Sequence, residues 1–319
     1  MKKLYPQIEP YKIHNLQVDK LHTLYIEESG NPDGLPVIFL HGGPGGGCKP
    51  HHRSFFNPEK QRIIIFDQRG AGRSTPAGEI EQNSTPELIA DLELIRKTLK
   101  VDCWLLYAGS WGATLALLYA QTFPKKVLGM ILRGSFLARQ RDLDWFTKDG
   151  VSRIYPDYWQ RLTGFVGGDE EVVNAIHADL LSEDKKVQQR SAREWSIWGG
   201  AVALGPAFDP AFLETESVSA AELNQAKIEL HYAVNRYFIE ENQILNHCDK
   251  ISHLPVTLIH GRNDLVCPVE SAWTLHEKLP NSELTILPNS GHLADGEEMI
   301  DALVCATDEM LEKRLKAEK

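Results

Sequence analysis

The stretch Trp104-Leu-Leu-Tyr-Ala-Gly-Ser110-Trp-Gly-Ala-Thr-Leu-Ala-Leu-Leu-Tyr119 joins a short apolar run to a helix-like segment through a single serine. The apolar run predicts a buried strand, and the alanine- and leucine-rich continuation predicts a helix. A tight turn between the two requires small residues two positions before and after the serine, and these are Ala108 and Gly112. The pattern is typical of a nucleophile elbow, so we predict that Ser110 is a catalytic nucleophile.

Strand-like and helix-like segments alternate around this stretch. One intervening segment begins at Thr85-Pro86, which we interpret as an N-cap and a first-turn proline, and it continues with an apolar stripe at Leu88, Leu92, Ile95 and Leu99. Such alternation predicts a mostly parallel central sheet flanked by helices. The expected strands are Val37–Leu40, Arg62–Phe66, Trp104–Tyr107, Val127–Leu132, Val256–His260 and Leu284–Leu287, and Ile300–Leu315 is the expected final amphipathic helix.

The middle of the chain, residues 137–247, is rich in Trp, Tyr and Glu and poor in strand signals. We interpret it as a helical cap domain inserted between two halves of one sheet. The predicted fold is therefore α/β, of the α/β-hydrolase type. Residues 1–136 and 248–319 would form the catalytic domain, and residues 137–247 the cap.

A serine hydroxyl needs a base to take its proton and an acid to orient that base. Asp264 and His292 each follow a predicted strand late in the chain, and the order Ser110, Asp264, His292 is the one that α/β-hydrolases use. We predict that these three residues form the catalytic triad. Asp295 and Glu297 are weaker candidates for the acid, because they would have to fold back on His292 from the same loop.

A glycine-rich loop, His41-Gly42-Gly43-Pro-Gly-Gly-Gly47, follows an early strand. It lacks the Gly-Lys-Ser/Thr ending of a P-loop, so it is not a phosphate-binding loop of that kind. In this fold the loop after the third strand and the residue after the nucleophile supply the N–H groups of the oxyanion hole. We assign these to Gly43 and Trp111, with Gly42 as the alternative to Gly43.

The charge, the apolar runs and the cysteine content argue against several other classes of protein. A net charge of −10 with no basic cluster argues against nucleic acid as a partner, and no apolar run is long enough to span a membrane. The N-terminus does not resemble a secretory signal. The five cysteines are scattered without a C-x-x-C pair, so we expect no disulfide framework, no zinc site and a cytoplasmic location. His51 and His52 are adjacent and expected to point apart, so we predict no metal.

Seven motifs are spread over nearly the whole chain. They are His41-Gly-Gly-Pro-Gly-Gly-Gly47, Asp67-Gln-Arg-Gly-Ala-Gly-Arg-Ser74, Gly109-Ser-Trp-Gly112, Leu132-Arg-Gly134, Trp195-Ser-Ile-Trp198, His231-Tyr232 and His260-Gly-Arg-Asn-Asp-Leu-Val-Cys-Pro268. Together they closely resemble the proline iminopeptidase (prolyl aminopeptidase) family. The resemblance implies the same Ser110, Asp264 and His292 triad, a helical cap over the active site and no cofactor. It also implies a small peptide, or an amino-acid amide or ester, as substrate. From its Arg and Asp content alone, the turn 67–74 is expected to brace loops through Arg–carboxylate pairs.

An aminopeptidase has to recognise a cationic N-terminus, and carboxylates are the physical means. The resemblance implies two cap glutamates for this role. One is present as Glu229 within Ile228-Glu-Leu-His-Tyr232, but Gly199 stands where the other is expected. Glu194 is a candidate replacement for the missing glutamate.

Three further pocket residues follow from the same resemblance. Phe136 and Cys267 are retained, and Phe146 stands where the family tends to have tyrosine. We therefore predict a serine exopeptidase that releases an N-terminal residue, most readily proline. The alternative is an esterase or amidase of the same fold that needs no free amine, which the glycine at 199 motivates. A catalytically silent binding protein of this fold is a third possibility.

Overall fold

The fold was analysed in a computed structural model that describes residues 1–169, 171–211 and 218–317. Its centre is an eight-stranded sheet in the order β1-β2-β4-β3-β5-β6-β7-β8. Strand β2 pairs antiparallel with both β1 and β4, and every pairing from β4 through β8 is parallel. The strands are β1 (Lys12–Gln17), β2 (Thr23–Gly30), β3 (Leu35–Leu40), β4 (Gln61–Phe66), β5 (Trp104–Gly109), β6 (Val127–Arg133), β7 (Val256–Gly261) and β8 (Ser282–Leu287). The predicted mostly parallel sheet is confirmed.

The six predicted strands are all present, but β1 and β2 were missed. The sequence of β2 does not follow the apolar pattern of a buried strand, because two of its residues, Glu27 and Glu28, are buried carboxylates. They pair with Arg53 at 2.5 Å and with Arg62 at 2.5 Å, side chains that come from outside the strand. A short-range apolar pattern does not reveal a strand whose burial depends on such distant partners.

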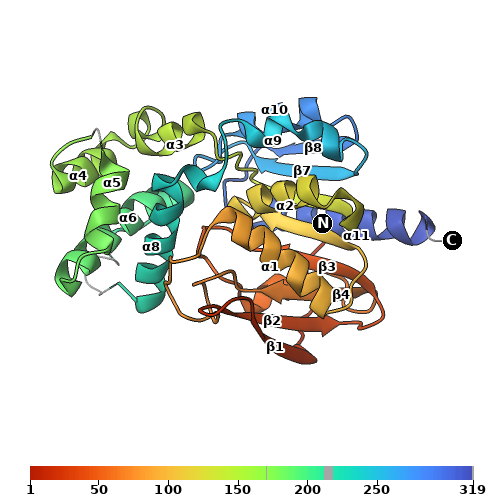
Figure 1. Cartoon of the computed structure of the whole chain (residues 1–319). Coiled ribbons are helices and arrows are strands. Elements are labelled where there is room, and N and C mark those ends of the chain that lie inside the picture. The colour runs from red at the N-terminus through yellow and green to blue at the C-terminus, as the bar shows by residue number, and fades with distance from the viewer. Residues whose placement is uncertain (170, 212–217, 318–319) are drawn as a thin grey trace.

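Helices cover both faces of the sheet (Figure 1). On one face α1 (Thr85–Thr98), α2 (Trp111–Thr122) and α10 (Val269–Lys278) share a hydrophobic cluster with side chains of β3, β4 and β5. On the other face α11 (Glu297–Ala317) and the short helix η1 (Pro50–Phe55) share a second cluster. All six residues of β5 are buried, so the strand that leads to Ser110 is held from both sides.

The crossover helix α1 buries the predicted stripe Leu88, Leu92, Ile95 and Leu99. Its start differs from the prediction by one residue. Ser84 is the N-cap, and Thr85 is the first helical residue. The Thr85 hydroxyl instead donates a hydrogen bond of 2.5 Å to the backbone carbonyl of Tyr237, so its role is to tie α1 to the segment after α8.

Only helices stand between β6 and β7 in the described part of the segment 137–247, from which residues 170 and 212–217 are excluded. Figure 1 shows α4, α5, α6 and α8 grouped at one side of the sheet. In the hydrophobic cluster that also contains α2, side chains of these helices pack together. The helices are α3 (Gln140–Thr147), α4 (Pro156–Val166), α5 (Val172–Leu180), α6 (Lys185–Leu204), α8 (Ala220–Val234) and α9 (Gln243–Asn246).

The turn 67–74 makes the Arg–carboxylate pairs that its sequence predicts. The buried Arg69 guanidinium binds both carboxylate oxygens of Asp91, at 2.6 and 2.8 Å, and also reaches Asp19 at 2.7 Å. Arg73 binds Asp67 at 2.8 Å. Paired ions of this kind are costly to break, because one partner is left buried and charged.

The structure also bears on the expectations about membrane spans, disulfides and the adjacent histidines. Within the described ranges, no helix has both the length and the apolar character that a membrane span requires. All five cysteines are free thiols. The rings of His51 and His52 lie 4.5 Å apart, so the expectation that they point apart was wrong. Both lie in the 3-10 helix η1, whose three residues per turn differ from the strand or α-helix on which that expectation was based.

Candidate active site

Ser110 occupies the turn between β5 and α2. Its backbone has φ 58° and ψ −128°, a conformation that residues other than glycine rarely adopt. A side chain at Gly112 would collide with the backbone carbonyl of Leu40, and one at Gly109 would collide with the guanidinium of Arg133. The turn therefore depends on the small residues that the sequence motif contains. The Ser110 backbone N–H is fixed by a 3.0 Å bond to the carbonyl of Arg133.

The loops after β7 and β8 bring Asp264 and His292 together. Asp264 Oδ2 lies 2.8 Å from His292 Nδ1. The other oxygen of Asp264 accepts backbone N–H bonds from Val266 at 3.0 Å and Cys267 at 2.8 Å. Burial alone would raise the pKa of Asp264, but His292 and these donors hold it below its ordinary value. The acid is therefore ionised beside the histidine. Neither Asp295 nor Glu297 occupies this position.

A second histidine, His260, lies behind this pair and was not predicted. It is fully buried, with Nε2 2.7 Å from the carbonyl of Cys267 and 3.4 Å from Asp264 Oδ2. Burial lowers the pKa of His260, so the ring is neutral and donates to the carbonyl. The contact fixes the turn 264–267, which carries the acid. Its signal in the sequence was its place at the start of the motif His260-Gly-Arg-Asn-Asp264.

The glycine loop lies directly beside Ser110. A side-chain carbon at Gly42 would stand 3.7 Å from Ser110 Oγ, and Gly43 lines the same pocket as Ser110. Trp111 is the first residue of α2, where backbone N–H groups have no partner within the helix. The glycine loop and the start of α2 thus both lie next to the serine.

His41 and Gln68 hold this glycine loop in place, and the sequence did not reveal it. His41 contacts this loop through both ring nitrogens. Nε2 accepts a 3.0 Å bond from the Gln68 backbone N–H, and Nδ1 lies 2.9 Å from the Gly42 carbonyl oxygen and 3.2 Å from the Gly47 backbone nitrogen. Burial lowers the pKa of His41, which keeps the ring neutral. The Gln68 side chain also accepts from the indole N–H of Trp111 at 3.0 Å. The two sides of the candidate oxyanion hole are therefore tied to each other.

An inner pocket opens next to Ser110 and contains all four predicted substrate-binding residues. Glu229 is the only one with a charge. Its carboxylate accepts a 3.4 Å bond from the indole N–H of Trp195, and burial raises the pKa of Glu229 to about 7. Among the described residues it has no ion-pair partner. The lining consists of Gly43, Ser110, Phe136, Asp142, Leu143, Phe146, Trp195, Glu229, Ala233, Tyr237, Val266 and Cys267.

Tyr237 is a part of this pocket that the sequence did not reveal. It lies in a run of three left-handed residues, Arg236, Tyr237 and Phe238, with φ between 49° and 55°. Its ring stacks on Trp111 at 5.7 Å and meets Phe136 edge-on at 5.0 Å. Non-glycine residues in this conformation are strained, and such strain is often found at functional sites.

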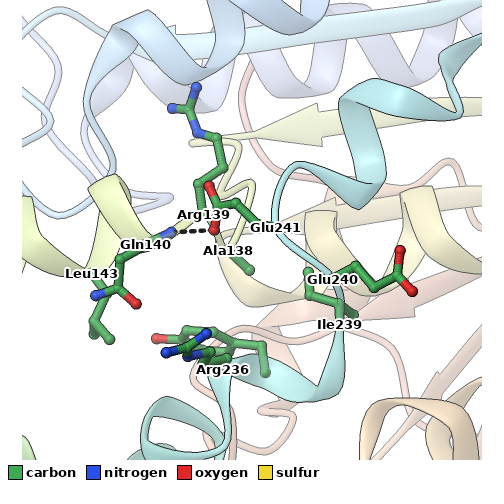
Figure 2. A pocket seen from close by; sticks show the side chains of 9 residues that line it. Ala138, Arg139, Gln140, Leu143, Arg236, Ile239, Glu240 and Glu241 are labelled. Carbon is green, nitrogen blue, oxygen red and sulfur yellow. Dashed lines mark hydrogen bonds between the residues drawn. The ribbon is translucent and has the colours of Figure 1, made fainter.

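A separate cavity of about 230 Å³ (Figure 2) also has Tyr237 in its lining. Figure 2 shows Glu241 accepting a bond from the backbone N–H of Gln140, at 3.0 Å. The described residues that line this cavity include neither Ser110 nor His292, so we do not place the reaction there. Its lining is Ala138, Arg139, Gln140, Leu143, Arg236, Tyr237, Ile239, Glu240 and Glu241.

A wider cleft of about 640 Å³ runs past Ser110 and His292 and includes Gly199. A side-chain carbon at Gly199 would have no neighbour within 4 Å, so the place of the missing glutamate is open space. Glu194 does not fill it. Its carboxylate pairs with Arg161 at 2.7 and 3.0 Å, and it lines neither the inner pocket nor the cleft.

The elbow and the acid–histidine pair at the carboxyl ends of a mostly parallel sheet define the chain as an α/β-hydrolase. The alpha/beta hydrolase fold family matches residues 36–297. The chain is 44% identical to a probable proline iminopeptidase of Leptolyngbya boryana, over 98% of each chain. It is 45% identical to a proline iminopeptidase of Arabidopsis thaliana, over 96% of this chain and 82% of the relative. The chain belongs to the proline iminopeptidase family of α/β-hydrolases.

Solved structures support the fold. A proline iminopeptidase-related protein of Thermus thermophilus superposes with a TM-score of 0.60, at 22% identity over 94% of this chain and 97% of the other. An esterase of Rhodococcus also gives 0.60, at 16% identity over 94% and 98%. The same architecture thus holds peptidase-related proteins and esterases, so the fold by itself does not select between the two candidate activities.

Proposed function

We propose that this protein is a serine exopeptidase that releases an N-terminal residue, most readily proline, from small peptides. The observation that carries the proposal is the Glu229 carboxylate. It stands in the wall of the pocket that contains Ser110 and has no cationic partner among the described residues. A buried carboxylate without a partner is costly, and the ammonium group of a substrate would supply the missing charge. The proline iminopeptidase relatives favour proline as the released residue.

In the proposed reaction Ser110 Oγ attacks the carbonyl carbon of the first residue, and His292 Nε2 accepts the hydroxyl proton. Asp264 keeps the proton of His292 on Nδ1 and stabilises the positive ring. The N–H groups of Gly43 and Trp111 bind the oxygen that becomes negative. His292 then returns the proton to the leaving amine, and the C–N bond breaks. Water, activated by the same histidine, hydrolyses the acyl-enzyme.

The inner pocket suits a compact apolar residue with a charged nitrogen. Phe136 and Phe146 supply aromatic walls, and the Phe146 ring meets Trp195 edge-on at 5.9 Å. Burial raises the pKa of the Cys267 thiol well above its ordinary value, so this group packs as a neutral side chain. The Glu229 carboxylate is then the group that distinguishes a free amine from a blocked one.

The alternative function is an esterase or amidase of relaxed specificity. The open space at Gly199 favours it, since a second carboxylate would otherwise help to bind the amine. The two functions differ in one measurable respect. An aminopeptidase loses activity when the substrate amine is acylated, whereas a relaxed esterase or amidase does not.

The test is the hydrolysis of proline β-naphthylamide, its N-acetyl counterpart and a short p-nitrophenyl ester, with Ser110→Ala as the background. We expect the free-amine substrate to exceed the blocked one by at least about tenfold in kcat/KM, the effect of one charge-assisted contact. Equal turnover of free and blocked substrates would exclude the aminopeptidase function.

We also propose a division of the chain into two domains and a location in the cell. We assign residues 1–136 and 248–319 to the catalytic domain and residues 137–247 to a cap that covers the inner pocket. Phe146 and Glu229 come from this cap segment. Five free thiols support a reducing compartment, and we propose the cytoplasm.

A further inference from the structure

The wide cleft that contains Ser110 is lined by residues from two groups of elements. The first group, which we call the cap wall, lies on α6 and α8 and includes Gly199, Glu222 and Glu229. The second group, which we call the histidine wall, comes from η1 and the residue before it, the end of β6 and the loop after β8. It consists of Lys49, His51, His52, Arg133, His292, Leu293, Ala294 and Asp295.

The histidine wall belongs to the other face of the sheet. His52 stacks on Phe39 at 4.3 Å, and Phe39 stacks on Tyr107 at 5.5 Å. Phe39 and Tyr107 are members of the cluster that α11 and η1 cover, whereas Phe136 and Trp195 belong to the cluster on the cap side. The histidine wall is therefore backed by one hydrophobic cluster, and the inner pocket by the other.

Arg133 differs from the fully buried arginines of this protein in its partners. It is half-buried, and its guanidinium donates to the backbone carbonyl of His292. Among the described residues, no carboxylate lies within ion-pair distance of it. Each fully buried arginine, in contrast, binds at least one carboxylate: Arg53 binds Glu27, Arg69 binds Asp91, Arg96 binds Glu93 and Arg139 binds Asp142.

Lys49 adds a second cation to the same wall. It is exposed at the cleft and has no ion-pair partner in the described ranges. The pKa of His52, which lines the same wall, is lowered to about 3 by burial and by the neighbouring His51, His41, Lys49 and Arg133. Asp295 is the one carboxylate on this wall, against two permanent cations. Glu222 and Glu229 belong to the cap wall.

The leaving group of the proposed reaction has to lie on the histidine wall, because His292 returns the proton to the leaving amine. In a dipeptide that leaving group is a free amino acid, whose carboxylate is only two bonds from the amine. We propose that Arg133 and Lys49 form a carboxylate subsite, and that the enzyme prefers dipeptides with a free C-terminal carboxylate. This inference rests on the proposed function and specifies its substrate class. Guanidinium and ammonium groups are the usual partners of carboxylates.

The test compares prolyl-alanine with prolyl-alaninamide, which differ in the carboxylate and release the same proline. Released proline is quantified, and the acid/amide ratio of kcat/KM is determined for each enzyme. We expect Lys49→Gln to lower that ratio about three- to tenfold, since the contact of an exposed lysine is weakened by solvent. Lys60→Gln is the matched control: it removes one exposed lysine outside the cleft and should leave the ratio unchanged. Added salt should lower the wild-type ratio towards that of Lys49→Gln.

The outcomes separate this inference from the function on which it rests. Release of proline from both substrates, with a ratio that neither Lys49→Gln nor salt changes, would overturn the carboxylate subsite and leave the aminopeptidase intact. No release of proline from either substrate, with turnover of a p-nitrophenyl ester, would overturn the aminopeptidase function and the subsite with it. A fall in the ratio that also appears in Lys60→Gln would show a general effect of charge, and it would contradict a local site.

Discussion

Replacement of Glu229 by glutamine should have opposite effects on stability and on activity. Burial raises the pKa of Glu229 from 4.5 to about 7. Between these two values the folded protein keeps a proton that the unfolded chain releases. Because the folded state then binds more protons than the unfolded state, stability falls as the pH rises through this interval. Glutamine has nearly the same shape and does not ionise, so the variant escapes this loss.

The magnitude follows from the shift. The rise in pKa from 4.5 to about 7, at about 1.4 kcal/mol per pH unit, amounts to about 3–4 kcal/mol of stability lost above pH 7. The carboxylate faces a cavity that admits water, so we expect a gain of about 2 kcal/mol for Glu229→Gln at pH 8 relative to pH 4.5. The same variant loses the charged partner of the substrate amine. Its kcat/KM for a free-amine substrate should fall about ten- to a hundredfold, the value of a charge-assisted hydrogen bond.

The assay is urea unfolding of the wild type and of Glu229→Gln at pH 4.5 and pH 8, with proline β-naphthylamide turnover measured on the same preparations. Glu59→Gln serves as the control, because it removes a carboxylate from an exposed position away from both the pocket and the cleft. An identical stability difference between wild type and Glu229→Gln at both pH values would refute the reasoning. A variant that is more stable at pH 8 and equally active would show that Glu229 is buried but does not bind the substrate.

Three further substitutions test other parts of the site. Gly199→Glu places a carboxylate in open space, so it should raise the free-to-blocked substrate ratio about tenfold; an unchanged ratio in the naphthylamide assay would show that the cleft supplies this charge elsewhere. Gly112→Ala would collide with the Leu40 carbonyl and should abolish soluble expression or activity, whereas a soluble, fully active variant would contradict the tight-turn argument. Asp264→Asn should lower kcat about a thousandfold or more with little change in KM, because His292 loses the acceptor that fixes its tautomer; steady-state kinetics that show a loss of less than about tenfold would count against the acid assignment.

The sequence predicted the parts of the fold that short-range rules determine. The turn around Ser110 is constrained by sterics within a few residues, so its motif was sufficient to place the strand before it and the helix after it. The pairing of Asp264 with His292 followed from the order of strands, because both loops leave the same edge of the sheet. Ser84, rather than Thr85, caps α1 because both residue types suit that position and only the backbone distinguishes them.

The missed features depend on distant contacts. Strand β2 carries Glu27 and Glu28 in its buried part, and only their arginine partners make that burial possible. Tyr237 enters the inner pocket through a run of three left-handed residues, none of which is a glycine or an asparagine. The hydrogen bonds from His41 through Gln68 to Trp111 join two loops and the start of α2, which are separate in the sequence. Short-range sequence patterns do not predict contacts between residues that are far apart in the chain.

Covalent labelling is the most direct test of whether Ser110 is an activated nucleophile. A fluorophosphonate reacts with a serine only when a neighbouring base activates it, and digestion followed by mass spectrometry locates the adduct. We predict a single adduct on the peptide that contains Ser110, its absence in Ser110→Ala, and much slower labelling in His292→Ala. An adduct on another residue, or equal labelling of wild type and Ser110→Ala, would contradict it.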